Sequence, residues 1–325
     1  MQRRATTLQA PAPRRRLPAL TPQWAPYVLL APFVVLFLVF GLFPLGFSLY
    51  LSFHSWQPAS GLDSMHFVGM RNFVFALHDP WFWLSMRNTL WLALVAGVAQ
   101  HVVAIPLAVF LQGSAARARD WLAGAYFMPY ITSTVAIAIL FSSLFALHHG
   151  LLNQLLGALS RVPLLGAWLP AHAIDWLGRP RYLKPAIAAV VFWRYLGFNV
   201  VLYLAALQTI DASLYEAAQL DGANAWQRFR HVTLPALRPM MWFAVTLSVI
   251  GGLQLFDEPF ILTGGRGGPD QAGMTAALYF YREAFDFDDF GGASAMSWIL
   301  FGFVALSTWL TSRAFASKSQ AEVSQ

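Results

Sequence analysis

The chain has 325 residues, of which 58% are hydrophobic and 11% charged, and a soluble domain of this length could not cover so many apolar side chains. It contains no cysteine, which excludes disulfides, thiolate metal sites and thiol nucleophiles. The formal net charge of +6 does not indicate a nucleic-acid partner, because the basic residues are scattered among apolar segments. These features predict an all-α polytopic membrane protein.

Six apolar stretches are long enough to cross a membrane as helices, since a crossing needs roughly 20 mostly apolar residues. They cover residues 27–52, 88–112, 122–147, 185–208, 240–263 and 291–313. The first is too long for a signal-peptide core and has no small-residue cleavage site, so we expect it to remain as a span. The predicted organisation is a basic N-terminal tail (1–26), a six-helix domain (27–313) and a C-terminal tail (314–325).

Basic residues before the first span predict the orientation. They are Arg3, Arg4, Arg14, Arg15 and Arg16. The positive-inside bias places this tail in the cytoplasm, and an even number of spans places the C-terminal tail there too. The loops at 54–86, 148–184 and 264–290 then lie outside. They are rich in Trp, Phe, Gly and Pro, which suits either segments at the membrane interface or a docking surface for a partner.

The segment between the fourth and fifth spans, about 209–239, is polar and helix-forming where a short turn would suffice. Asp211 is a capping acid for a first helix, and Gly222 can end it. Asn224 can cap a second short helix, which we expect Pro235 to break.

One face of the first of these helices is apolar and the other is polar. Leu214, Ala217, Ala218 and Leu220 form the apolar face, while Glu216 and Gln219 leave polar groups for recognition. We expect this element to fit a socket in another protein.

The spacing in this segment resembles the EAA signature: E-A-A, three residues, G, nine residues, I, one residue, L-P. That signature belongs to the inner-membrane permease subunits of binding-protein-dependent ABC importers. The matching positions are Glu216, Ala217, Ala218, Gly222, Val232, Leu234 and Pro235, with Val232 in place of the usual Ile. The stretches "LTGGRGGPD" and "FVGMRNF" look like the carbohydrate-uptake, maltose-permease-like branch of this family.

The resemblance implies a type I ABC importer permease fold in the bacterial plasma (inner) membrane. The segment would be the coupling helix that docks into a cytoplasmic ATPase, with Glu216 as the polar contact, Gly222 as the turn and Pro235 as the break before span five. The implied partners are a second, homologous permease subunit in a heterodimer, two cytoplasmic ATPase subunits, an extracytoplasmic solute-binding protein and membrane lipid.

No phosphate-binding G-x-x-x-x-G-K-[ST] loop occurs in the sequence, so the chain is predicted to be a transport subunit and not an enzyme. ATP and Mg would act on the partner ATPase, and no cofactor is expected here. "GGRGGPD" follows a span and reads as a turn. His148 and His149 have no third ligand nearby, so no metal site is expected. His101 stands alone in span two and is interpreted as a satisfied buried histidine.

Arg194 is the clearest charged residue inside a predicted span, and each such residue is a functional hypothesis. Helical spacing places it with Tyr195, Phe198 and Tyr203, and Asn199 adds an amide. Aromatic faces stack on sugar rings, and these polar groups can bond sugar hydroxyls. The alternatives for Arg194 are snorkelling or pairing with an acid of the partner subunit.

On span five, Ser248, Gly251, Gly252 and Leu255 share a face of little bulk, which suits either close helix packing or room for a ligand. The maltose-type resemblance implies that the spans flanking the coupling segment supply sugar contacts. Asp257 and Glu258 are expected to be interfacial.

The predicted function is therefore a permease subunit that forms half of the path for a sugar or oligosaccharide. One alternative keeps the importer but carries an anionic solute, such as a glycerol phosphodiester, held by Arg194. Another is an ion-coupled secondary transporter, but no acidic mate for Arg194 is predicted and that class leaves the coupling segment unexplained. A membrane enzyme would need a nucleophile and base, or a metal-ligand cluster, and the spans show neither.

Overall fold

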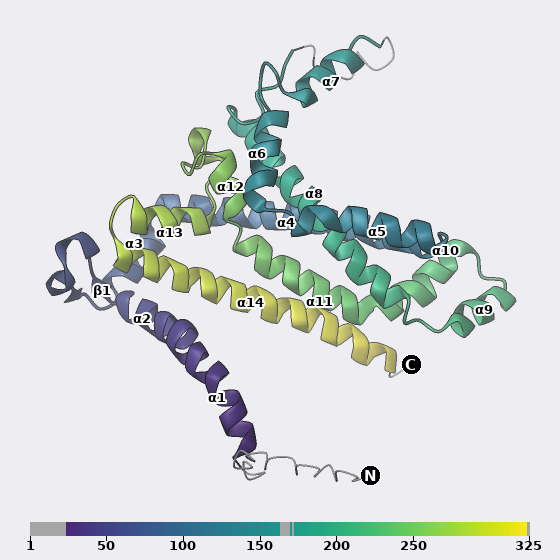
Figure 1. Ribbon diagram of the computed structural model, residues 1–325, viewed down its shortest axis with the longest axis horizontal. Helices are drawn as coiled ribbons and strands as arrows, with labels where there is room; N and C mark the ends of the chain where they lie inside the picture. The colour runs from purple at the N-terminus through teal and green to yellow at the C-terminus, as the bar shows by residue number, and fades with distance from the viewer. Residues whose placement is uncertain (1–23, 163–169, 171, 324–325) are drawn as a thin grey trace, which may run out of the picture. The chain divides into compact units, whose positions relative to one another are not determined.

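The computed structural model describes residues 24–162, 170 and 172–323, and Figure 1 shows their arrangement. The contacts divide the chain into two units, residues 1–50 and 51–325, which are described separately. In the first, α1 (Ala25–Phe37) continues through a π-helical segment, Leu38–Leu42, into α2 (Phe43–Leu51). The result is one apolar helix over Pro26–Leu51, as predicted for the first span. The predicted N-terminal tail lies almost wholly outside the described residues.

The second unit is a helical bundle. Its helices are α3 (Arg71–His78), α4 (Pro80–Gln112), α5 (Ala116–Ile131), α6 (Thr134–Leu144), α7 (Leu151–Leu159), α8 (Pro180–Leu207), α9 (Ala212–Leu220), α10 (Ala225–Arg228), α11 (Leu234–Leu253), α12 (Asp257–Leu262), α13 (Ala276–Phe285) and α14 (Phe290–Val323). Strands β1 (His54–Ser55) and β2 (His66–Phe67) form a small antiparallel pair, with His54 opposite Phe67. Helix α14 continues past residue 313, so the predicted C-terminal tail is helical through Val323.

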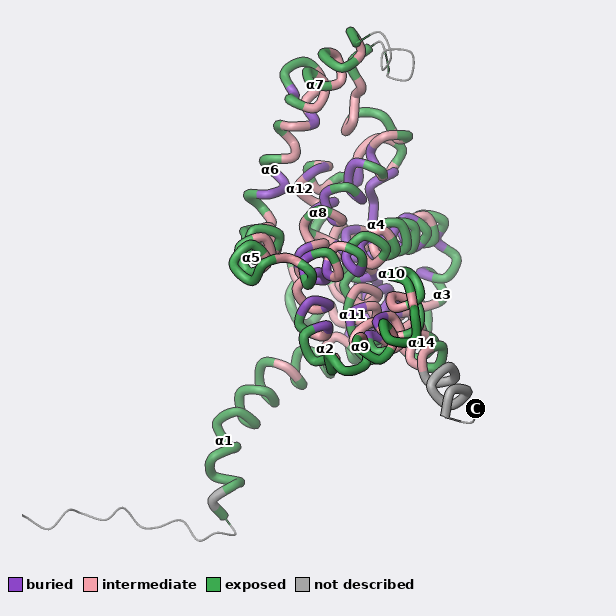
Figure 2. The backbone as a smooth tube through the Cα atoms, turned by 90° about the vertical axis from the view of Figure 1, so that its right-hand side faces the viewer, coloured by how far each residue is buried: buried purple, intermediate pink, exposed green. Residues whose placement is uncertain are grey.

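The long helices pack around α4 and α8. Helix α8 lies along α4 and α5, while α11 packs between α4 and α14. The buried positions lie where these helices face one another (Figure 2). Tyr203 of α8, Leu111 of α4 and Leu237 of α11 are each 0% exposed in one shared cluster. Phe82 and Met296 anchor a second cluster between α4 and α14.

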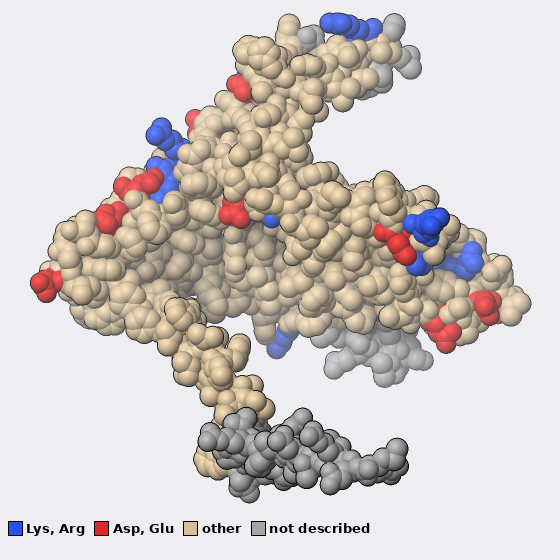
Figure 3. Space-filling view, viewed as in Figure 1, with Lys and Arg blue, Asp and Glu red and all other residues tan. Residues whose placement is uncertain are grey.

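Charged side chains gather toward the ends of the bundle on the face in Figure 3, and the surface between is almost uncharged. Five helices of the described chain are long and apolar enough to cross a membrane, and a sixth candidate is the pair α5 and α6. These six match the predicted stretches in order. The prediction of one unbroken helix over 122–147 is wrong. This stretch forms two helices, α5 and α6, which meet at 94°.

The bend between α5 and α6 follows from local chemistry. Thr132 and Ser133 adopt extended ψ angles of 148° and 127°, and the Thr132 hydroxyl donates to the Met128 carbonyl at 2.8 Å. Hydroxyl side chains that bond nearby carbonyls compete with the helix ladder. Pro129 weakens the last turn of α5 further, since it has no N–H to donate.

The predicted break at Pro235 does not occur. Helix α10 runs through a π-helical segment, Phe229–Thr233, straight into α11, and the Leu234 N–H bonds the Phe229 carbonyl five residues back. Pro235 lies in the first turn of α11, directly after this π-helical segment, and adds no N–H to the helical ladder there. The candidate span covers Ala225–Leu262, longer than the predicted 240–263, and residues 254–256 between α11 and α12 are not helical.

A polar cluster joins α13 to the start of α4. The Asp79 carboxylate caps α4 by accepting from the Trp81 N–H at 2.9 Å, and its other oxygen accepts from the Tyr279 hydroxyl at 2.6 Å. Burial, followed by this hydrogen bond, raises the pKa of Tyr279. Glu283, one turn further along α13, is half-buried, and burial together with the carboxylates of Asp289 and Asp79 raises its pKa to about 6.

The raised pKa of Glu283 predicts a pH-dependent stability. The folded chain holds this proton more tightly than the unfolded chain, so stability falls as pH rises from about 4.5 to about 6. Glu283→Gln removes that penalty and should stabilise the protein by about 1 kcal/mol above pH 6, after allowing for solvent screening. In detergent, the melting temperature should rise by about 2 °C at pH 7.5 and not at pH 4.5. The control is Asp63→Asn, at an exposed carboxylate. An equal gain at both pH values would contradict the assignment.

Candidate coupling loop and central cavity

The loop between α8 and α11 forms two capped helices. The Asp211 carboxylate accepts from the Ser213 N–H at 2.9 Å, and this bond holds the pKa of Asp211 below its usual value. Helix α9 ends before Gly222, whose φ of +78° favours glycine. Asn224 and Gln227 form a reciprocal capping box at the start of α10. The two predicted caps and the glycine turn are therefore present.

This loop presents apolar side chains that the rest of the described chain does not cover. Leu220 is 90% exposed, Trp226 66% and Leu214 52%. Glu216 is exposed, and among the described residues no hydrogen bond or ion pair engages its carboxylate. Figure 1 shows α9 and α10 at one end of the bundle, with α3 and α13 at the other.

The loop is held to the bundle by its two ends. The hydroxyls of Tyr215 and Thr233 lie 3.0 Å apart and join α9 to the start of α11. Leu234 and Pro235 are half-buried, and Leu237 is fully buried against α8 and α4. A force on α9 would therefore reach α11 through ordered contacts.

A cavity of about 280 Å³ lies between α4, α5, α8 and α11. Ligand pockets are concave and mostly apolar, with a few placed polar groups, and this cavity has that character. Its lining is Leu92, Ala93, Ala96, Gly97, Gln100, Tyr130, Val191, Tyr195, Phe198, Asn199, Leu247, Ser248, Ile250, Gly251, Gly252 and Leu255.

Two buried amides supply polar groups to this cavity. The Gln100 amide donates to the Val191 carbonyl at 3.1 Å and accepts from the Asn199 amide at 3.3 Å. The Asn199 carbonyl oxygen is buried and has no hydrogen-bond partner within the described chain. A buried unpaired acceptor is unfavourable until a donor reaches it, such as a ligand hydroxyl.

Three aromatic rings form one wall. The rings of Tyr130 and Phe198 stack with centroids 4.6 Å apart, and Tyr195 meets Tyr130 edge-on at 5.8 Å. Such faces suit the apolar face of a planar or cyclic ligand.

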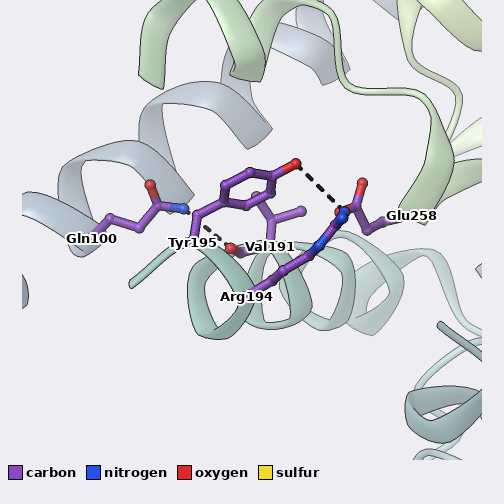
Figure 4. Close-up of polar contacts among 5 residues, drawn as sticks. All are labelled: Gln100, Val191, Arg194, Tyr195 and Glu258. Atoms are coloured by element: carbon purple, nitrogen blue, oxygen red, sulfur yellow. Dashed lines mark hydrogen bonds and ion pairs between the residues drawn. The ribbon is translucent and has the colours of Figure 1, made fainter. Parts of the chain in front are cut away.

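Arg194 forms an ion pair within this chain. Its Nη1 lies 2.7 Å from Oε1 of Glu258, and the two side chains are 11% and 2% exposed (Figure 4). The alternatives of snorkelling and of pairing with a partner-subunit acid are therefore wrong. The expectations that Glu258 is interfacial and that Arg194 lacks an acidic mate are also wrong, although the neighbouring Asp257 is exposed.

The structure brings together six of the seven residues predicted for the substrate path. Tyr195, Phe198, Asn199, Ser248, Gly252 and Leu255 line the cavity, and Arg194 does not. The face of little bulk on α11 serves close helix packing at one glycine and leaves open space at another. A Cβ at Gly252 would come within 2.8 Å of the Ala93 side chain, so that glycine permits close packing, while a Cβ at Gly251 meets open space.

Two polar or aromatic cavity residues were missed, Gln100 and Tyr130, and the other unpredicted lining residues are aliphatic or glycine. Gln100 precedes His101 in the apolar run of α4, and an amide in such a run could have been singled out in the same way. Tyr130 lies beside the unpredicted bend. Tyr203, placed on the Arg194 stripe, instead packs in the core, and its hydroxyl lies 2.8 Å from Nδ1 of His101. His101 Nε2 is buried without a partner in the described chain, so that histidine is only half satisfied.

Long apolar helices around a partly polar cavity, with an exposed amphipathic loop at one end, define a polytopic membrane transport subunit. Residues 104–316 match the family described as binding-protein-dependent transport system inner membrane component, and the chain belongs to this family. Its fold is the type I permease fold of that family.

Relatives across most of the chain carry transport names. The chain is 35% identical to the lactose transport system permease protein LacF of Rhizobium radiobacter, over 87% of this chain and 91% of LacF. It is 32% identical to the arabinooligosaccharides transport system permease protein AraP of Bacillus subtilis, over 85% and 83%.

A solved structure has the same fold. It is a chain of a bacterial ABC transporter involved in the import of the acidic polysaccharide alginate, with a TM-score of 0.75, 21% identity, and coverage of 91% of this chain and 96% of that one.

Proposed function

We propose that the chain is one permease subunit of an ATP-driven importer for a sugar or oligosaccharide. It forms half of the translocation path, and a homologous second subunit supplies the other half. The observation that carries the proposal is the pairing of a cavity between α4, α5, α8 and α11 with an uncovered amphipathic loop joining α8 to α11.

The loop between α8 and α11 is the element that binds a separate ATPase subunit. Leu220, 90% exposed, and Trp226, 66% exposed, offer apolar side chains that a partner can bury, and Trp is a residue type enriched among interface anchors. Two cytoplasmic ATPase subunits would each receive one such helix and use ATP and Mg. Because the loop ends in α8 and α11, which both line the cavity, closure of the ATPase subunits would rock the cavity walls and alternate access.

The orientation follows from this role. The loop must face the cytoplasm to meet an ATPase, and the basic N-terminal segment agrees with that side. Both ends of the chain would then be cytoplasmic, and the surfaces around α3, α7 and α13 would receive the solute-binding protein.

The cargo is inferred from the cavity and from the named transport roles of LacF and AraP. Stacked rings at Tyr130 and Phe198 suit a sugar face, and the Gln100 and Asn199 amides suit hydroxyls. The anionic alternative relied on Arg194 as a free charge, and Glu258 occupies that charge.

Filling the cavity should block transport without disturbing assembly. Ser248→Trp places a bulky ring in the cavity, and we expect sugar uptake by the assembled importer to fall at least tenfold. The matched control is Ser143→Trp, on an exposed position of α6, which should retain uptake. Unchanged uptake in Ser248→Trp would rule out this cavity as the path.

A reconstitution experiment tests the function as a whole. The purified chain, with its partner permease, ATPase subunits and binding protein, is placed in liposomes, and accumulation of labelled lactose and arabinooligosaccharides is measured. We expect accumulation of at least one sugar that requires both ATP and the binding protein. ATP-independent accumulation driven by an ion gradient would contradict the proposal.

A further inference from the structure

Position 194 lies on the helix face that forms the cavity wall. Val191, Tyr195 and Phe198 line the cavity from α8, and they recur at i, i+4 and i+7. Residue 194 is the i+3 position of the same stripe, so its side chain starts from the cavity side of the helix. The Arg194 side chain nevertheless extends toward Glu258 and is absent from the cavity lining (Figure 4).

Glu258 binds the guanidinium closely. The 2.7 Å contact is a charge-assisted hydrogen bond, and both partners are nearly excluded from solvent. Nη1 of Arg194 also lies 3.5 Å from the Tyr195 hydroxyl, and that tyrosine lines the cavity. The ion pair therefore lies directly behind the cavity wall.

The pair leaves the cavity without a free charge. The lining contains amides, hydroxyls, rings and aliphatic groups but no Lys, Arg, Asp or Glu. In such an apolar setting, a single unpaired cation would attract a carboxylate strongly, because charges interact far more strongly there than in water.

We propose that Glu258 is a specificity-determining residue, which draws the Arg194 charge out of the cavity and so sets its preference for uncharged over acidic sugars. The proposal rests on the cavity being the sugar path. Without the Glu258 carboxylate, Arg194 must find water or another anion, and the cavity that Tyr195 lines, with its two amides, adjoins the guanidinium.

The first test compares two sugars that differ in one group. Binding of cellobiose and of its uronic-acid counterpart, in which a carboxylate replaces one hydroxymethyl group, is measured on the detergent-purified importer. In Glu258→Gln, the affinity ratio should shift toward the acid by at least tenfold relative to wild type. Asp257→Asn, which removes the exposed neighbouring carboxylate, should leave the ratio unchanged.

A second test measures the accessibility of the Arg194 side chain without any sugar. p-Hydroxyphenylglyoxal modifies accessible arginines, and the labelled residue is identified by mass spectrometry. We expect labelling of Arg194 to rise at least fivefold in Glu258→Gln and to stay at the wild-type level in Asp257→Asn. If both the labelling and the affinity ratio stay at wild-type values, the proposal is overturned.

Loss of a buried partner can prevent assembly, so two paired variants keep the test decisive. Arg194→Met with Glu258→Met removes both charges, and Arg194→Glu with Glu258→Arg exchanges them. Each should keep the wild-type preference for cellobiose, and a shift of either toward the acid overturns the proposal. If neither sugar binds to wild type while the labelling changes as expected, the sugar assignment fails but the role of Glu258 in holding Arg194 stands.

Discussion

Leu220→Asp should uncouple the importer while leaving the chain folded. Leu220 is 90% exposed, so its replacement removes almost no packing within this chain. If α9 seats in an ATPase cleft, a carboxylate at this position would be desolvated without a partner, at a loss of about 2 kcal/mol or more in binding. Solute-stimulated ATP hydrolysis and uptake should both fall at least tenfold, and less ATPase should copurify with the permease.

The matched control for this prediction lies in the segment between β1 and β2. Leu62 is 74% exposed, and Leu62→Asp makes the same chemical change at the other end of the molecule. It should leave ATPase copurification at the wild-type level. Both variants should melt within about 2 °C of wild type in detergent, since both positions are exposed. Normal ATPase binding by Leu220→Asp would remove α9 as the coupling element.

The coupling loop could be predicted from the sequence because its determinants are local. Asp211, Gly222 and Asn224 act on backbone groups within a few residues, so the caps and the turn are legible without a tertiary structure. The predicted helix break at Pro235 was wrong because a proline alone does not reveal whether it ends one helix or begins the next. The π-helical segment before it, Phe229–Thr233, continues the helix into α11 through backbone hydrogen bonds, and no sequence pattern predicts that segment.

The cavity could be predicted only in part. Helical spacing placed Tyr195, Phe198 and Ser248 on the correct faces of their own helices. It could not show that Gln100 and Tyr130, from two other helices, meet them there, because each helix can rotate against its neighbours until packing is known. Long-range pairing was equally hidden, since Arg194 and Glu258 are 64 residues apart and nothing local to either indicates the other.

Gly197→Ala, at the point where α8 crosses α5, should strongly destabilise the protein. A Cβ at position 197 would lie 1.7 Å from the Tyr126 carbonyl oxygen and 2.3 Å from its carbonyl carbon, so a single methyl group must push the two helices apart. Backbone atoms cannot rotate away as a side chain would, and overpacking of this kind costs about 3 kcal/mol. We expect the melting temperature in detergent to fall by about 5 °C.

The same displacement should reach the cavity. Tyr130 lies four residues beyond Tyr126, and Phe198 directly follows Gly197, so separating α5 from α8 pulls apart the two rings that stack 4.6 Å from centroid to centroid. Gly197→Ala should therefore lower sugar affinity as well as stability. Gly124→Ala is the control on α5, since a Cβ there meets nothing within 4 Å and alanine favours the helix. If the two alanine variants melt and bind alike, the backbone contact at this crossing does not exist, and the aromatic wall must be held in place by other contacts.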